Sequence, residues 1–156
     1  MQKRSKYIAL IGALILSAGA LILVFGQSRQ RNASGIEGVW QTVVTPRVCT
    51  TGNPVGPTFP GILMFSQGGT MTGTSTAVTS VYGVWDREPG SRQYSFATIS
   101  LKYDAGILVG SRRITQIVTL DASGNSFTST GTFQDYDLAG NPTISGCSTS
   151  TGTRFE

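Results

Sequence analysis

The chain has 156 residues, a length that accommodates one domain. Its net charge of +4 is unevenly spread: five of the twelve basic residues precede residue 36, and all eight acidic residues follow it. The part from residue 36 onward therefore carries seven basic and eight acidic residues, and Arg112-Arg113 is its only adjacent basic pair. Binding to a phosphate backbone requires lysines and arginines gathered on one face, so nucleic acid is excluded as the expected partner.

The first 26 residues have the features of a segment that enters a membrane. Three basic residues precede an uncharged run over residues 7–26, and twenty residues in a helix match an apolar bilayer core of about 30 Å. We therefore expect a retained transmembrane anchor within residues 1–26, followed by a polar linker over residues 27–35. Cleavage as a signal peptide after Ser28 is the alternative. The chain from residue 36 onward would then be extracytoplasmic, anchored in the first case and secreted in the second.

From residue 36 onward the sequence has the pattern of β-strands. Threonine, serine and glycine alternate with β-branched and aromatic residues, and no segment keeps a 3.6-residue apolar period. Phe127 and Phe133 fall on one face of their run, whereas Thr128 and Thr130 fall on the other. Turn sequences divide this part into eight runs. These runs cover residues 36–45, 61–66, 70–79, 81–86, 92–103, 107–120, 126–136 and 143–155.

The connections between these runs predict how the strands are joined. All of them are short except residues 46–60, and short connections favour an antiparallel meander. A meander of eight strands leaves no exposed edge if it closes on itself. We therefore predict an all-β domain over residues 36–156, an eight-stranded antiparallel up-and-down barrel that is preceded by one transmembrane or signal helix. A β-sandwich is the alternative, although its Greek-key crossovers need more than one long connection.

The two cysteines are Cys49 and Cys147, and both lie in the part expected outside the cytoplasm. In an oxidising compartment such a pair is more often a disulfide than two free thiols. Closure of the barrel would make the first and last strands neighbours, so a Cys49–Cys147 bridge would join them. The chain has no histidine, and two cysteines are too few ligands for a structural zinc site, so we expect no metal and no cofactor.

Near the start of the first run, Gly38-Val39-Trp40 resembles the Gly-x-Trp motif of the calycin barrels, which include lipocalins, fatty-acid-binding proteins and avidins. In that group the tryptophan closes one end of the barrel, and an arginine of the last strand packs across its face. The resemblance implies that Arg154 is this partner, and that Gly38, Trp40 and Arg154 have structural roles. The same tripeptide recurs at residues 83–85, and an ordinary core position for Trp40 is the alternative.

The chain departs from lipocalins because it ends within the last run and has no C-terminal helix. It also resembles small bacterial barrels related to allene oxide cyclase and dirigent proteins. Those relatives are enzymes or guides of coupling reactions, so a shared fold does not define one activity.

The interior of the predicted barrel is the main candidate for a functional site. An eight-stranded barrel is just wide enough to be filled by side chains or to hold one small ligand. Aromatic and methionine side chains directed inward would suit an apolar molecule, although they would equally fill a dry core. The residues expected to contact such a ligand are Met64, Met71, Trp85, Tyr94, Phe96, Phe127 and Phe133.

No catalytic residues are assigned. Without histidine, neither a serine triad nor the commonest general base is available, and the paired acids sit beside turns. We therefore expect an extracytoplasmic, membrane-tethered lipocalin-like barrel that binds a small apolar ligand. One alternative is an interaction module of the cell envelope. Another is a cyclase or isomerase, which would require a buried ionisable group, with Glu37, Asp135 and Tyr94 as the residues to inspect.

Overall fold

The computed structural model describes residues 35–155. The predictions of a membrane anchor, of its cleavage and of the linker before Gly35 lie outside these residues. Within the described part, no helix is long and apolar enough to cross a bilayer. Eight strands make up the domain: β1 (Gly38–Arg47), β2 (Phe59–Phe65), β3 (Thr70–Ser75), β4 (Val81–Arg87), β5 (Gln93–Asp104), β6 (Ile107–Leu120), β7 (Ser126–Tyr136) and β8 (Pro142–Arg154).

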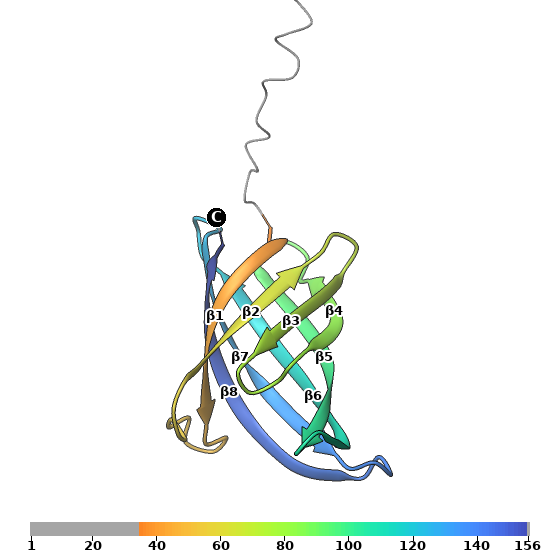
Figure 1. The fold of residues 1–156 in the computed structure, drawn as a ribbon. Coiled ribbons are helices and arrows are strands. Elements are labelled where there is room, and N and C mark those ends of the chain that lie inside the picture. Colours follow the sequence, from red (N-terminus) through yellow and green to blue (C-terminus); the bar gives the residue numbers. More distant parts are fainter. Residues whose placement is uncertain (1–34, 156) are drawn as a thin grey trace, which may run out of the picture. The chain divides into compact units, whose positions relative to one another are not determined.

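The strands form one closed barrel in sequence order, and β1 pairs with β8 to complete it (Figure 1). Every neighbouring pair is antiparallel. The prediction of an eight-stranded antiparallel barrel is therefore confirmed. The third strand is shorter than expected and ends at Ser75, because Ser75 and Val78 exchange backbone hydrogen bonds of 2.8 and 3.3 Å that turn the chain toward β4.

The two ends of the barrel differ in the connections between their strands. We call the end filled by the hydrophobic core the closed end, and the opposite end the open end. The closed end contains Gly35, Arg154 and the turns β2–β3, β4–β5 and β6–β7. The open end contains the remaining four connections, including the long β1–β2 segment (Figure 1).

The hydrophobic core lies toward the closed end. Trp40 and Ile36 are fully buried there, and the Trp40 indole donates a hydrogen bond of 2.7 Å to the Ile36 carbonyl oxygen. Phe127 meets the Trp40 ring edge-on, with ring centres 5.0 Å apart. The other buried members are Phe65, Met71, Tyr94, Phe96, Val118, Leu120 and Phe127. These large side chains come from the strand ends nearest the closed end, so they fill that half of the interior.

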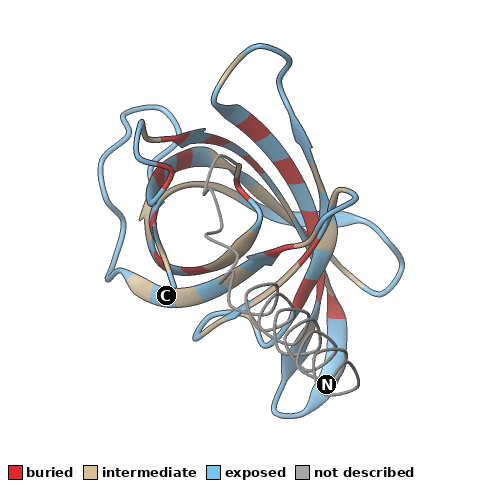
Figure 2. Cartoon of the chain, turned by 90° about the horizontal axis from the view of Figure 1, so that it is seen from above, coloured by how far each residue is buried: buried red, intermediate tan, exposed pale blue. Residues whose placement is uncertain are grey.

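Side chains alternate between the interior and the solvent along each strand, as the buried and exposed bands in Figure 2 show. The clearest case is β5, where every second residue from Tyr94 to Ser100 is buried. One inward assignment is wrong: Met64 is 43% exposed on the outer face, whereas Phe65 is buried. The run Ile62-Leu63-Met64-Phe65 is apolar throughout, so its sequence does not show which residues face inward. Phe65 faces inward because it packs against Trp85 and Phe96, whose ring centres lie 6.2 and 5.9 Å from its own.

The seam between β1 and β8 is held at both ends. At the closed end the Arg154 guanidinium lies 4.3 Å from the Trp40 ring centre and donates hydrogen bonds to the carbonyl oxygens of Gly35, Glu37 and Gly124 at 2.6 to 3.0 Å. A guanidinium in this position gains a cation–π contact and also pairs backbone groups at the barrel end. Toward the open end, a disulfide joins Cys49 to Cys147, which confirms the predicted bridge.

Candidate functional site

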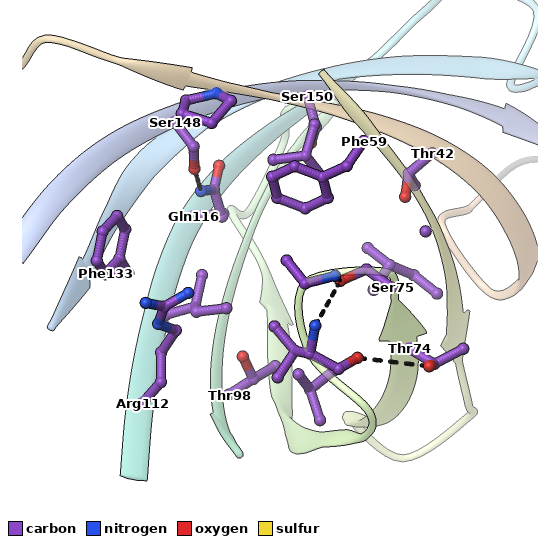
Figure 3. A pocket seen from close by; sticks show the side chains of 18 of the residues that line it. Thr42, Phe59, Thr74, Ser75, Thr98, Arg112, Gln116, Phe133, Ser148 and Ser150 are labelled. Carbon is purple, nitrogen blue, oxygen red and sulfur yellow. Dashed lines mark hydrogen bonds between the residues drawn. The ribbon is translucent and has the colours of Figure 1, made fainter. Parts of the chain in front are cut away.

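The half of the barrel toward the open end is hollow. It contains a cavity of about 240 Å³ (Figure 3). Apolar side chains form much of its wall, among them Phe59, Leu63, Val81, Phe96, Ile114 and Phe133. Hydroxyl groups also line it, from Thr42, Ser75, Thr98, Ser148 and Ser150. Such a mixture of apolar walls and a few polar groups is typical of small-molecule sites.

The cavity exists because small side chains replace large ones in this half of the interior. On β8 the inward positions are Ser148 and Ser150. Gly146 of β8 stands directly opposite Phe133 of β7, and the Phe133 ring lies over this glycine. The ring therefore lies along the wall, and the small serine side chains do not fill the remaining space.

The volume indicates the size of molecule that the cavity could hold. An apolar cavity of about 150 Å³ accommodates benzene, and pockets for drug-sized ligands begin near 300 Å³. A cavity of about 240 Å³ lies between them. It suits a molecule of roughly ten non-hydrogen atoms, scaled from benzene.

Gln116 supplies an unpaired polar group to the cavity wall. Its side chain is 5% exposed, and its amide nitrogen donates a hydrogen bond of 2.9 Å to the Ser148 hydroxyl. The amide oxygen has no hydrogen-bond partner among residues 35–155. In the opposite amide orientation the Ser148 hydroxyl would donate to the oxygen, and the amide nitrogen would be left without a partner. A buried polar atom without a partner costs about 1–3 kcal/mol of stability.

Three charged side chains meet at the mouth of the cavity. Asp135 on β7 is fully buried, and its carboxylate accepts hydrogen bonds of 2.6 and 3.0 Å from Arg112 on β6. Lys102 on β5 donates a third, at 2.5 Å. The Arg112 guanidinium also lies 4.3 Å from the centre of the Phe133 ring. Arg112 is the only charged side chain of the described residues that lines the cavity.

The pKa of Asp135 is set by two opposing effects. Burial alone would raise it, but hydrogen bonds from Arg112 and Lys102 and the charges of both side chains outweigh burial and lower the pKa below its ordinary value. Asp135 is therefore a carboxylate at neutral pH. The pKa values of two turn acids are also lowered: that of Asp121 to about 2, chiefly by its hydrogen bond from Ser123, and that of Asp137, chiefly by its hydrogen bond from Asn141.

We expect acid to destabilise the barrel partly through Asp135. Its folded pKa lies below its unfolded pKa, so its contribution to stability is complete above the unfolded value near 4 and is lost as the pH falls through the folded value. Urea unfolding at pH 5 and at pH 2.5 should show a larger fall in unfolding free energy for the wild type than for Asp135→Asn. The variant keeps Asp121 and Asp137, so the difference isolates Asp135. Equal falls would contradict this assignment.

Two further hollows flank the interior. One, of about 150 Å³, lies beside the mouth and is lined by Ser100, Lys102 and Arg112 among others. The other, of about 560 Å³, is a shallower and more polar depression at the closed end, where Trp85 and Tyr94 contribute to its wall.

The residues predicted to contact a ligand fall into three groups. Phe96 and Phe133 line the cavity. Met71, Tyr94 and Phe127 are buried in the core of the closed end, and Trp85 is partly buried and packs against this core beside Tyr94. Met64 faces outward. The structure therefore combines a filled core in one half with a cavity in the other.

Of the residues proposed for an enzyme, only Asp135 is buried beside the cavity. Glu37 is exposed, and Tyr94 is buried in the core at the closed end. Because two cations hold the Asp135 carboxylate and lower its pKa, it is a weak proton acceptor at neutral pH. Its geometry is that of a group that positions Arg112 and Lys102.

Comparison with known proteins adds no relative. No family model, no curated protein and no solved structure matches the chain at a significant level.

Proposed function

We propose that this chain is an exported barrel, tethered to the membrane through residues 7–26, that binds a small and largely apolar molecule in the cavity at its open end. The observation that carries this proposal is the unequal filling of the interior. Large side chains pack the closed end, whereas the open end keeps a cavity of about 240 Å³. Interiors selected for stability alone are close-packed, because an unfilled cavity costs free energy.

Further features support an exported, lipocalin-like binding protein. The disulfide between Cys49 and Cys147 is of a kind that persists in oxidising compartments outside the cytoplasm. Stacking of Arg154 on Trp40 at the closed end supports the likeness to calycin barrels, in which an arginine of the last strand covers this tryptophan. A closed end and an open mouth are also the arrangement that lets one molecule enter a barrel.

A variant that fills the cavity tests the proposal. Thr98 lines the cavity and stands opposite Gly83 on β4, so a phenylalanine there can lie over the glycine and extend into the empty space, as Phe133 does over Gly146. We expect Thr98→Phe to reduce binding of a neutral ligand of fitting size, 4-phenylbutanamide, at least about tenfold in calorimetric titration, because the ring would occupy its site.

The matched control is Ala97→Phe, which adds the same ring on the outer face of the same strand. It should bind the amide as the wild type does. Native mass spectrometry of protein purified without added ligand would show whether a molecule of this size is already bound. The proposal fails if the wild type binds no neutral or anionic ligand of this size, or if Thr98→Phe binds as well as Ala97→Phe.

A further inference from the structure

The mouth of the cavity has an excess of positive charge. Arg112 and Lys102 share the single carboxylate of Asp135, so the three side chains together carry a net charge of +1. The side chains of Lys102 and Arg112 remain 32% and 23% exposed, whereas that of Asp135 is fully buried. The cations therefore present their free sides to the space at the mouth, and the anion does not.

Neighbouring acids do not pair with these two cations. Asp137, two residues after Asp135, accepts hydrogen bonds of 2.8 and 3.0 Å from the backbone amide and the side-chain amide of Asn141. Asp104 is exposed at the tip of the β5–β6 hairpin. Among the described residues that line the cavity or the hollow beside it, the charged ones are Arg112 and Lys102.

An unpaired hydroxyl lies next to the two cations. Ser100 stands directly opposite Arg112 across β5 and β6, and Arg112 in turn stands opposite Asp135 across β6 and β7. Ser100 is 3% exposed and lines the hollow beside the mouth. Its hydroxyl has no hydrogen-bond partner among residues 35–155. A guanidinium, an ammonium and an unpaired hydroxyl thus come from neighbouring positions of β5 and β6 and line the same hollow, and all three are hydrogen-bond donors.

We propose that the ligand is a small apolar monoanion, such as a monocarboxylate, whose apolar body fills the cavity while its charged group is bound at the mouth by Arg112, Lys102 and Ser100. This inference rests on the proposed function and specifies its ligand. Asp135 holds the two cations in place and keeps their combined charge at +1, which matches one negative charge. Phe133 supports the Arg112 guanidinium from one side and also forms part of the apolar wall, so the charged and apolar parts of the site adjoin (Figure 3).

A pair of ligands of the same shape tests the inference. 4-Phenylbutyrate and 4-phenylbutanamide differ in the charge of one end, so calorimetric titration of both against the wild type measures the contribution of that charge. We expect the carboxylate to bind at least roughly tenfold more tightly, because hydrogen bonds to a charged acceptor are about twice as strong as neutral ones. Its affinity should fall as salt rises from 20 to 500 mM, whereas that of the amide should not.

Three variants change the charge at the mouth in different directions. Lys102→Met leaves the Arg112–Asp135 pair intact and makes the cluster neutral, so the preference for the carboxylate should fall severalfold. Asp135→Asn keeps the shape of the side chain and raises the net charge to +2, so the carboxylate should bind more tightly than it does to the wild type. A folding defect would weaken binding, so tighter binding in Asp135→Asn separates the charge effect from damage to the fold.

Arg113→Gln is the matched control for Arg112→Gln. Arg113 follows Arg112 on the same strand, is exposed on the outer face and stacks on Tyr136 at 5.1 Å. Arg113→Gln should leave the preference for the carboxylate over the amide unchanged, whereas Arg112→Gln should abolish this preference. If the wild type binds amide and carboxylate equally, or if Asp135→Asn with a wild-type circular dichroism spectrum binds the carboxylate more weakly, the inference fails while the proposed function stands. If neither ligand binds, the proposed function fails with it.

Discussion

Replacing Cys49 and Cys147 together by serine is expected to lower the free energy of unfolding by about 4 kcal/mol. The disulfide closes a loop of 98 residues in sequence separation, and in the chain-entropy model a loop of this length contributes about 4–5 kcal/mol by restricting the unfolded chain. It also fixes the long β1–β2 connection to β8 beside the cavity, since Cys147 lines the cavity wall. In a domain of this size the change corresponds to a fall in Tm of roughly 15 °C.

Urea unfolding followed by circular dichroism measures this effect. Wild-type protein reduced with dithiothreitol should unfold as the double serine variant does, and the variant should be insensitive to the reductant. If the variant lies within about 1 kcal/mol of the oxidised wild type, the bridge does not carry the stability assigned to it.

Trp40→Ala is expected to lower the free energy of unfolding by a similar amount, about 4 kcal/mol. The indole is fully buried, packs against Phe127 with ring centres 5.0 Å apart and lies under the Arg154 guanidinium. Its removal would leave a cavity at the closed end and deprive Arg154 of its stacking partner. Because this core lies away from the open end, binding of 4-phenylbutanamide at temperatures where the variant remains folded should change little.

Trp85→Ala provides the comparison within the same chain, because Trp85 belongs to the second Gly-Val-Trp sequence. Its indole packs edge-on against Phe65, but it is only partly buried. It hydrogen-bonds the carbonyl oxygens of Ser66 and Thr70, both at 3.0 Å. Trp85→Ala should therefore lower the free energy of unfolding by less than half as much as Trp40→Ala does. Equal losses would mean that the closed-end arrangement of Trp40 and Arg154 contributes nothing beyond ordinary burial of an aromatic ring.

The inward direction of one residue of the charged cluster could be predicted from the sequence alone, but its partner could not. Arg112 shares its face of β6 with Ile114, Gln116 and Val118, so the two-residue period of that strand already places it inward. In the sequence, Arg112 and Arg113 stand out as an adjacent basic pair. Successive residues of a strand face opposite sides, so only one of the two can point inward, and this signal was not used. The partner could not be found in this way, because Asp135 lies 23 residues further along and its contact depends on the register of β6 with β7.

The sequence by itself determined the eight strands and their meander, because alternation and short turns are local properties that each segment carries independently. It also indicated the disulfide, because two cysteines in the part expected outside the cytoplasm are more often paired than free. The pairing of β1 with β8 decided between a closed barrel and a β-sandwich, because it joins residues from the two ends of the domain. Only the tertiary structure decided which half of the interior is filled. That outcome depends on which side-chain volumes lie beside one another on neighbouring strands, such as Ser148 and Ser150 of β8 opposite Gly131 and Ser129 of β7, and no single strand contains this information.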